Sequence, residues 1–247
     1  MDIKTFFHEY PEVAIAFSGG VDSAYLLYAA RKYATKSKAY YVKSEFQPEF
    51  ELRDAERLAK ELNADLCVLK AQVLEDADVA GNPANRCYFC KKRIFTMISA
   101  KALSDGFTTI LDGTNASDRA DDRPGMKALA ELEVKSPLRE CGLTKDEIRG
   151  LSREAGLFTW DKPAYACLAT RIATDEFITG EKLKKIELAE DYLFSKGYTD
   201  FRVRTLDGHA RLEVPENQWM MVAENRNEIY DTLKQYFKTV SLDLNTR

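Results

Sequence analysis

Short apolar runs alternate with amphipathic segments along the first two thirds of the chain. Such runs predict buried strands at residues 13–17, 39–43, 65–69, 108–111 and 134–138. Apolar positions at helical spacing predict helices at residues 21–30, 49–62, 86–104 and 144–156. Thr144, with Glu147 three residues on, predicts a capping box at the start of the last of these helices. Because strands that alternate with helices form βαβ units, we expect an α/β domain with a mostly parallel five-stranded sheet.

The last third of the chain has a different pattern, which begins after a change of composition at residues 160–171. It predicts a charged helix, two strands, a second helix and a final strand, at residues 179–196, 200–206, 209–214, 215–237 and 239–244. Asp207-Gly208 between the two strands is a strong hairpin turn. We therefore predict a first domain at 1–160, a linker at 161–178 that carries Cys167, and a small α+β domain at 179–247.

The composition is ordinary for a soluble globular protein. Of the 247 residues, 45% are hydrophobic and 31% are charged, and a net charge of −4 gives no overall attraction to nucleic acid or anionic membranes. No apolar run approaches the roughly 18 residues of a membrane span, and the N-terminus has no signal-peptide core. We therefore expect a cytoplasmic protein that contacts no membrane and has no nucleic-acid partner.

The strongest local signal is S-G-G-V-D-S at residues 18–23, between the first predicted strand and the helix after it. A strand that turns on glycines into a helix directs several backbone N–H groups at one point, where the helix dipole adds positive charge. Adjacent glycines let a phosphate approach, and Asp22 and Ser23 add a candidate magnesium ligand and a hydroxyl. The fourth predicted strand brings Thr114 to the same sheet edge.

This motif resembles the PP-loop of the N-type ATP pyrophosphatases, and it lacks the Gly-Lys-Ser/Thr of a Walker A loop. That family cleaves ATP between the α and β phosphates, adenylates a substrate oxygen and holds pyrophosphate in this loop. The resemblance implies that the first domain is a PP-loop ATP pyrophosphatase domain. It also implies that ATP, with Mg²⁺ at Asp22, is bound by Ser18, Gly19, Gly20, Asp22, Ser23 and Thr114.

Five cysteines in a cytosolic chain indicate metal binding or catalysis rather than a disulfide framework. Cys87 and Cys90 stand three apart at a predicted helix start, where the dipole and neighbouring basic residues favour the thiolate. A third ligand has to come from elsewhere, and Cys167 is the best candidate. Three thiolates suit an iron–sulfur cluster with one open iron better than a structural zinc. We interpret Cys67 as a core residue and Cys141 as a turn residue without a catalytic role.

Six groups of motifs extend the resemblance to one branch of the superfamily. In order they are S-G-G-V-D-S, N-R-C-Y-F-C-K, D-G-T-N-A-S-D, S-P-L-R-E with L-T-K-D-E-I-R, K-P-A-Y-A-C-L-A-T-R-I, and R-V-R with A-R-L-E-V-P. They resemble the LarE-type sulfur transferases over nearly the whole chain. That family makes the pyridinium mononucleotide thiolate of the nickel-pincer cofactor of lactate racemase. ATP adenylates a carboxylate of pyridinium-3,5-biscarboxylic acid mononucleotide, and a sulfur nucleophile then displaces AMP.

The resemblance also implies the roles of the cysteines. Cys87, Cys90 and Cys167 match the family branch that holds a four-iron–four-sulfur (4Fe-4S) cluster with an extra sulfide. In the other branch, a lone cysteine in the C-L-A-[ST]-R motif gives up its own sulfur and becomes dehydroalanine. The first branch implies an exogenous sulfide or another sulfur donor, and the family implies a homo-oligomer such as a hexamer.

Further residues match family positions that handle the anionic substrate. Arg171, Arg202 and Arg204 match positions that bind its phosphate, and on a strand Arg202 and Arg204 point to the same face. Glu190 and Glu213 match positions that hold a metal or orient the substrate.

Two other classes of function stay open at this stage. One is another PP-loop enzyme, either a tRNA thiolase, for which we expect a basic surface or zinc-ribbon cysteines, or an ammonia-using ligase, which needs no cysteine trio. The second is a nucleotide-binding or cluster-sensing module without turnover. Pyrophosphate release that depends on a substrate excludes this second class.

Overall fold

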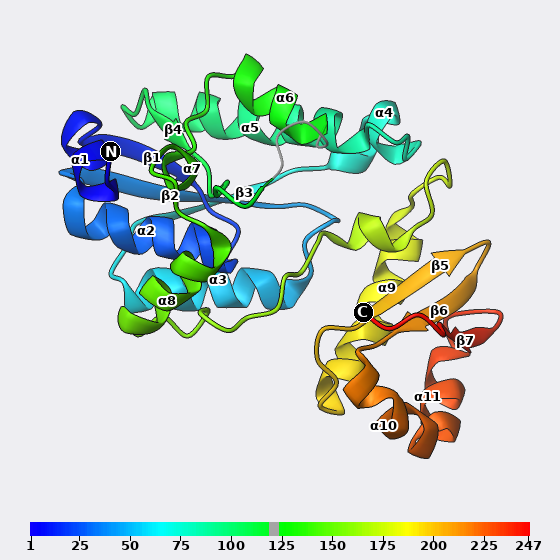
Figure 1. The fold of residues 1–247 in the computed structure, drawn as a ribbon. Coiled ribbons are helices and arrows are strands. Elements are labelled where there is room, and N and C mark those ends of the chain that lie inside the picture. Colours follow the sequence, from blue (N-terminus) through cyan, green and yellow to red (C-terminus); the bar gives the residue numbers. More distant parts are fainter. Residues whose placement is uncertain (119–123) are drawn as a thin grey trace. The chain divides into compact units, whose positions relative to one another are not determined.

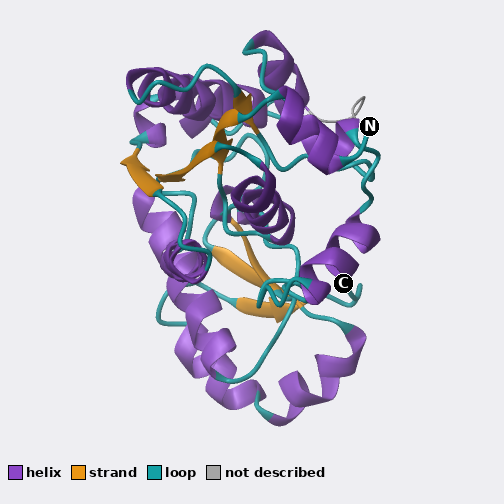
Figure 2. Ribbon diagram, turned by 90° about the vertical axis from the view of Figure 1, so that its left-hand side faces the viewer, coloured by secondary structure: helices purple, strands orange, loops and turns teal. Residues whose placement is uncertain are grey.

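The computed structural model describes residues 1–118 and 124–247, which form two compact units (Figure 1). The first unit comprises Met1–Val73 and Asn85–Lys162, and the second comprises Leu74–Ala84 and Pro163–Arg247. Each unit has its own sheet, with four strands in the first and three in the second (Figure 2). No helix within the described ranges has the length and apolarity needed to cross a membrane.

The sheet of the first unit is entirely parallel, with the strand order β3-β2-β1-β4. Its strands are β1 (Glu12–Ala16), β2 (Lys36–Lys43), β3 (Leu66–Lys70) and β4 (Ile110–Leu111). Strand β1 pairs with both β2 and β4, and Val13, Ala14 and Ile15 are fully buried. A strand covered on both faces is apolar throughout, which explains the unbroken apolar run in the sequence. The predicted α/β fold with a parallel sheet is confirmed.

The prediction of a fifth strand at residues 134–138 is wrong. Lys135 makes one parallel bridge to Leu111, with hydrogen bonds from its N–H to Ile110 O and from Asp112 N–H to its own carbonyl. Pro137 then begins a short helix, α7 (Pro137–Glu140). Because proline has no N–H to donate, the ladder ends after this single bridge.

Helices cover both faces of the first sheet. Figure 1 shows α5 and α6 on one face and α2, α3 and α8 on the other. The helices of this unit are α1 (Ile3–Glu9), α2 (Val21–Tyr33), α3 (Glu49–Glu61), α5 (Arg86–Ser104), α6 (Pro124–Glu131), α7 and α8 (Lys145–Glu154). Buried side chains of α1, α2, α8 and β1, among them Phe6, Leu26 and Ile148, form one apolar core. This core fixes the start of α2 relative to the end of β1.

The second unit combines a small mixed sheet with helices. Strand β6 (His209–Glu213) pairs antiparallel with β5 (Arg202–Leu206) and parallel with β7 (Val240–Leu242). The hairpin turn has positive φ at Asp207 (51°) and Gly208 (80°), as the Asp-Gly pair predicts. The helical elements are α4 (Ala77–Ala80), η2 (Leu168–Arg171), α9 (Gly180–Ser195), η3 (Glu216–Gln218), α10 (Trp219–Glu224) and α11 (Arg226–Leu233), and η1 (Val73–Glu75) starts at the last residue of the first unit's first segment.

The single helix predicted at residues 215–237 is divided into η3, α10 and α11. The break between α10 and α11 lies at Asn225, whose φ of −98° and ψ of 13° are not helical. Its side chain donates to the carbonyl of Met221 at 2.8 Å, beside the bond from its own N–H at 3.1 Å. Asparagine side chains compete in this way with the helical ladder, and apolar spacing alone does not reveal the competition.

The start of α8 is capped by two side chains. Thr144 and Glu147 form the predicted capping box, in which Thr144 N–H donates to Glu147 Oε2 at 2.8 Å and Glu147 N–H to Thr144 Oγ1 at 3.4 Å. We expect Thr144→Ala to lower the free energy of unfolding by about 1 kcal/mol, because it removes the side-chain acceptor at the helix start. Urea denaturation measures the change. Thr144→Ser is the matched control, since it retains the hydroxyl, and an equal loss in both variants would refute the role of the cap.

Candidate active site

The turn from β1 into α2 is built by Ser18, Gly19 and Gly20. The hydroxyls of Ser18 and Ser23 lie 3.0 Å apart, and Ser23 Oγ also accepts from Ser18 N–H at 3.3 Å and donates to Gly20 O at 3.2 Å. Gly20 is the N-cap of α2, and no side chain caps this helix. The first N–H groups of α2 are therefore available to an anion, as the sequence predicts.

Gly19 is required at this turn for two reasons. Its φ of +75° lies in the left-handed region, which costs an L side chain energy. A Cβ at this position would also lie 3.3 Å from both Ala55 Cβ and Glu51 O of α3. The loop consequently packs directly against α3, and a larger residue would displace it.

The loop after β4 meets this turn from the other side. A Cβ on Gly113 would come within 3.0 Å of Ser23 N, so the two backbones approach closely. Buried Asp112 accepts hydrogen bonds from Thr114 Oγ1 and, at 2.6 Å, from Ser136 Oγ. The predicted meeting of Thr114 with the first loop at one sheet edge is thus present.

Asp22, a predicted magnesium ligand, has two partners in this structure. Asn115 Nδ2 donates to one carboxylate oxygen at 3.3 Å, and Lys145 Nζ donates to the other at 2.6 Å. Lys145 is the first residue of α8 and lies 123 positions from Asp22 in the sequence. The sequence analysis missed Lys145, because no local pattern links it to the loop.

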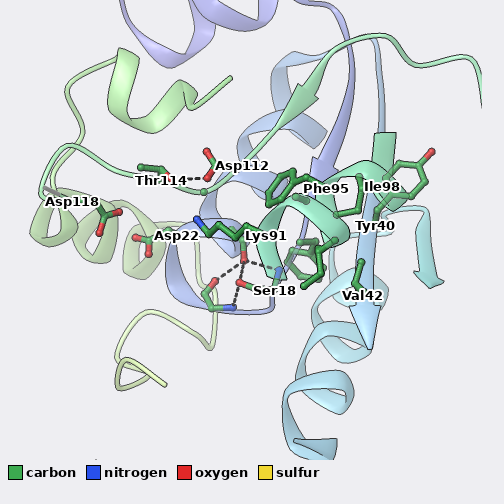
Figure 3. A pocket seen from close by; sticks show the side chains of 16 residues that line it. Ser18, Asp22, Tyr40, Val42, Lys91, Phe95, Ile98, Asp112, Thr114 and Asp118 are labelled. Carbon is green, nitrogen blue, oxygen red and sulfur yellow. Dashed lines mark hydrogen bonds between the residues drawn. The ribbon is translucent and has the colours of Figure 1, made fainter. Parts of the chain in front are cut away.

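A cavity of about 330 Å³ opens at the carboxyl ends of β1 and β4 (Figure 3). Its polar lining includes Ser18, Gly20, Asp22, Ser23, Lys91, Asp112, Gly113, Thr114 and Asp118. Its apolar lining includes Phe17, Val42, Phe95 and Ile98, with the ring of Tyr40 beside them. A site with one charged end and one apolar end has the character that a nucleotide needs, with phosphates at the first and a base at the second.

Lys91 is a second residue whose position the sequence analysis missed. It follows Cys90 on α5 and lines the same cavity as Ser18, Asp22 and Asp112 (Figure 3). Gly125 of α6 leaves room for its stem, since a Cβ there would lie 2.6 Å from Lys91 Cδ. Lys91 is therefore packed against α6 and adds a positive charge to the polar lining of the cavity.

Lys162 contributes one more positive charge near the loop. Its ammonium group donates to Asp54 Oδ2 at 2.7 Å and to Gly19 O at 3.5 Å. This lysine begins the K-P-A-Y-A-C-L-A-T-R-I motif, so part of that motif's role is to support the loop of the first unit.

The predicted cysteines belong to two units. Cys87 and Cys90 lie in the first turn and a half of α5, where Cys87 is exposed and Cys90 half-buried. Cys167 lies in the second unit, half-buried at the N-cap of η2. None of the three is in a disulfide. Cys67 is half-buried on the edge strand β3, and burial raises the pKa of Cys141, which packs beside the core of the first unit.

Arg171 and Glu190 form a buried ion pair in the second unit. Arg171 Nε lies 2.9 Å from Glu190 Oε1, and the side chains are 0% and 1% exposed. Burial by itself lowers the pKa of Arg171, but the hydrogen bonds and charge of Glu190 raise it above its usual value overall. Glu190, which the sequence predicts to hold a metal or orient the substrate, is therefore paired with Arg171, which the sequence predicts to bind the substrate.

The other two predicted arginines, Arg202 and Arg204, lie two positions apart on β5 and have different surroundings. Arg202 is buried and donates to the carbonyls of Phe201 and Ala164. Burial, with the nearby charges of Arg171 and Arg247, lowers the pKa of Arg202 to about 10, which still leaves it charged at neutral pH. Arg204 is more exposed.

A second cavity, of about 610 Å³, lies within the second unit. Arg204 and Arg211 line it together with Arg171, and both contact Glu213 Oε1, at 2.9 and 3.2 Å. Arg211 also contacts Asp243 Oδ2 at 3.1 Å. Thr170, Thr174, Thr205 and Ser241 belong to the same lining. Each guanidinium carries five N–H donors, so Arg204 and Arg211 can offer an anion hydrogen bonds in addition to their ion pairs.

The predicted carboxylate ligands do not converge on a metal in either unit. Asp22 is paired with Lys145, Glu190 with Arg171, and Glu213 with two arginines. Among residues 1–118 and 124–247, no group of three or more His, Cys, Asp or Glu side chains is arranged to hold a metal ion. At Asp22, a magnesium ion would therefore need ligands from ATP itself.

Comparison with known proteins agrees with the geometry. A family model described as asparagine synthase matches residues 8–118, which contain the loop and the end of β4. An uncharacterized protein of Synechocystis sp. is 35% identical over 248 residues, which cover 98% of this chain and 92% of that protein. An uncharacterized protein of Methanocaldococcus jannaschii is 31% identical over 234 residues, which cover 94% of this chain and 89% of that protein.

A third relative has a named function and identifies the branch of the PP-loop superfamily. Pyridinium-3,5-bisthiocarboxylic acid mononucleotide synthase of Lactiplantibacillus plantarum is 31% identical over 237 residues, which cover 94% of this chain and 85% of that protein. The similarity spans both units and includes the loop, the α5 start and the segment around Cys167. The chain therefore belongs to the LarE-type family of PP-loop sulfur transferases and is an ATP-dependent adenylating enzyme.

Proposed function

We propose that this enzyme adenylates a carboxylate of pyridinium-3,5-biscarboxylic acid mononucleotide and replaces a carboxylate oxygen with sulfur, as a step of nickel-pincer cofactor biosynthesis. The observation that carries the proposal is the first unit's cavity, where an uncapped helix start, Lys91 and Thr114 surround one polar end. The named relative supplies the substrate class.

ATP is proposed to bind with its phosphates at the polar end of this cavity. The N–H groups at the start of α2 and the hydroxyls of Ser18 and Ser23 would donate to phosphate oxygens. Lys91 would neutralise the charge that develops on the departing pyrophosphate. Magnesium would shield the phosphate charge further, with Asp22 as a ligand once it exchanges Lys145 for the ion. The adenine would contact Phe95 and Ile98.

The substrate's phosphate and ribose are proposed to bind in the second unit's cavity. Arg204 and Arg211 line it and would donate to phosphate, while threonine and serine hydroxyls would contact the ribose. Arg211 was not among the residues selected from the sequence. Arg202 and Arg171 contribute positive charge nearby, although their present hydrogen bonds go to protein groups.

The proposed reaction has two steps. A carboxylate oxygen of the substrate attacks the α-phosphorus of ATP, and the bond from that phosphorus to pyrophosphate breaks. A sulfur nucleophile then attacks the carbonyl carbon, and the C–O bond to AMP breaks, which leaves the thiocarboxylate. The first step is needed because an unactivated carboxylate oxygen does not leave, whereas AMP does.

Cys87, Cys90 and Cys167 are the residues proposed to hold a 4Fe-4S cluster. The residue type suits this group, because thiolates are the usual ligands of iron–sulfur clusters and all three thiols are outside disulfides and half-buried or exposed. Cys87 and Cys90 occupy successive turns at a helix start, whereas Cys167 belongs to the second unit, and the three are not gathered around a metal position among the described residues. When bound, a cluster with three protein thiolates supplies an iron that can take an exogenous sulfide. The alternative is that Cys167 alone donates its sulfur.

The first prediction tests the reaction as a whole. Anaerobically purified protein incubated with ATP, Mg²⁺, sulfide and the dicarboxylate mononucleotide should release AMP and pyrophosphate and form the thiocarboxylate, which mass spectrometry detects. Pyrophosphate release should depend on the mononucleotide, because the carboxylate is the attacking group. Equal release with and without it would contradict the proposal.

The second prediction concerns Lys91. We expect Lys91→Met, which keeps the stem and removes the charge, to lower the rate of substrate-dependent pyrophosphate release by about a hundredfold. Lys92→Met is the matched control, since Lys92 pairs with Glu131 at 3.2 Å and does not line the cavity. Similar rates in both variants would remove Lys91 from the ATP site.

The third prediction separates the two sulfur sources. Cys87→Ser should abolish both the iron–sulfur absorbance of anaerobically reconstituted protein and repeated turnover with sulfide, because three ligands are needed. Cys67→Ser, on the edge of the sheet, should retain both. If Cys87→Ser still completes one turnover and dehydroalanine appears at position 167, Cys167 is the sulfur donor.

A further inference from the structure

Arg171 holds the backbone on both sides of the Cys167 side chain. Its Nη1 donates to the carbonyl of Ala166 at 2.7 Å and to that of Cys167 at 3.4 Å. The same nitrogen lies 2.9 Å from Thr170 Oγ1, and that hydroxyl lies 2.9 Å from the Cys167 carbonyl. One guanidinium group thus fixes the path of the chain through the cysteine.

Two arginines of β5 hold the ends of the same segment. Arg202 donates to the carbonyl of Ala164, and Arg204 donates to the carbonyl of Thr170. Residues 164–170 contain no strand and only part of the short helix η2, so they lack a regular ladder of their own. Charged hydrogen bonds from arginines take the place of that ladder.

Glu190 of α9 holds Arg171 in turn. Its Oε1 accepts from Arg171 Nε at 2.9 Å and from Val203 N–H at 2.9 Å. Its Oε2 accepts from Arg171 Nη2 at 3.0 Å and from the hydroxyl of Tyr165. With two donors on each oxygen, the carboxylate has filled its usual acceptor sites.

The pair is also closed to solvent. Arg171 and Glu190 are each 1% exposed, and the Arg171 guanidinium lies over the Tyr165 ring at 4.4 Å. For Arg171 to bind a substrate anion, it would have to leave a buried bidentate partner and leave that charge unpaired. Such a change is strongly unfavourable in a protein interior.

We propose that Arg171 and Glu190 are positioning residues, which fix Cys167 for the sulfur-transfer step and bind neither substrate nor metal. The proposal rests on the proposed function in one respect, namely that Cys167 takes part in sulfur transfer. Displacement of a reacting group by about 1 Å can cost roughly a hundredfold in rate, so a rigid support for a cysteine outside regular structure has a direct catalytic value. Adenylation does not need this support, because its residues lie in the first unit's cavity.

The experiment compares Arg171→Lys, Glu190→Gln and the milder Tyr165→Phe with the wild-type chain. Glu228→Gln is the matched control, since it breaks an ion pair of the same unit, with Lys196, that does not involve the Cys167 segment. Three quantities are measured on the full-length chain: substrate-dependent pyrophosphate release with its KM for the mononucleotide, thiocarboxylate formation, and the iodoacetamide alkylation rate of Cys167 in metal-free protein. Alkylation of Cys87 in the same sample is the internal reference.

We expect Arg171→Lys and Glu190→Gln to lower thiocarboxylate formation by about tenfold or more, with the KM and the rate of pyrophosphate release nearly unchanged. The Cys167 alkylation rate should change several-fold relative to Cys87. Tyr165→Phe, which loses one hydrogen bond to Glu190, should change thiocarboxylate formation and the Cys167 alkylation rate in the same directions but by smaller factors. This variant keeps the test decisive if a charge variant does not fold.

Two results would overturn the proposal. A raised KM for the mononucleotide with unchanged sulfur transfer at saturation would make Arg171 a substrate ligand. Unchanged Cys167 alkylation and unchanged transfer in all three variants would make the network unrelated to the cysteine. If the wild-type chain forms no thiocarboxylate, the proposed function fails, whereas the alkylation measurement still decides whether the network positions Cys167.

Discussion

The turn from β1 into α2 is the constraint on which the first unit depends. Gly19 adopts a left-handed conformation where a Cβ would lie 3.3 Å from atoms of α3, and a Cβ on Gly113 would lie 3.0 Å from Ser23 N. Both contacts exclude a side chain, and together they leave the first N–H groups of α2 facing a cavity. An apolar core of α1, α2, α8 and β1 holds this geometry, so the anion site results from packing as well as from the loop itself.

Three lysines place positive charge around this turn, where an anion can bind. Lys91, Lys145 and Lys162 come from three separate segments, and two of them are paired with Asp22 and Asp54. A site prepared for a triphosphate needs compensating positive charge before the ligand arrives, because the field then requires little reorganisation. Before a ligand binds, Asp22 holds Lys145 in place and Asp54 holds Lys162.

The second unit uses arginines in two ways. Arg204 and Arg211 line a cavity and share Glu213, and Arg211 is also paired with Asp243. Arg171 is buried against Glu190 and directs its remaining donors to the backbone around Cys167. We therefore propose substrate recognition for the arginines that line the cavity and backbone support for the buried Arg171, and the difference lies in desolvation.

The sequence by itself determined the features that depend on near neighbours. Apolar runs located β1 and β2, the Ser-Gly-Gly turn located the start of α2, Asp207-Gly208 located the hairpin, and Thr144 with Glu147 located the start of α8. Backbone preference and apolar period act over a few residues, which is why these predictions are confirmed. The family could also be identified from motif order.

Only the tertiary structure decided which distant side chains meet. Lys145 reaches Asp22 across 123 positions, Gly125 makes room for Lys91, and Glu190 takes Arg171 as its partner. It also decided that Pro137 stops a fifth strand after one bridge and that Asn225 divides the last long helix. Charge pairing over long separations depends on how elements pack, and the sequence offers each of these charged residues many possible partners from which packing selects.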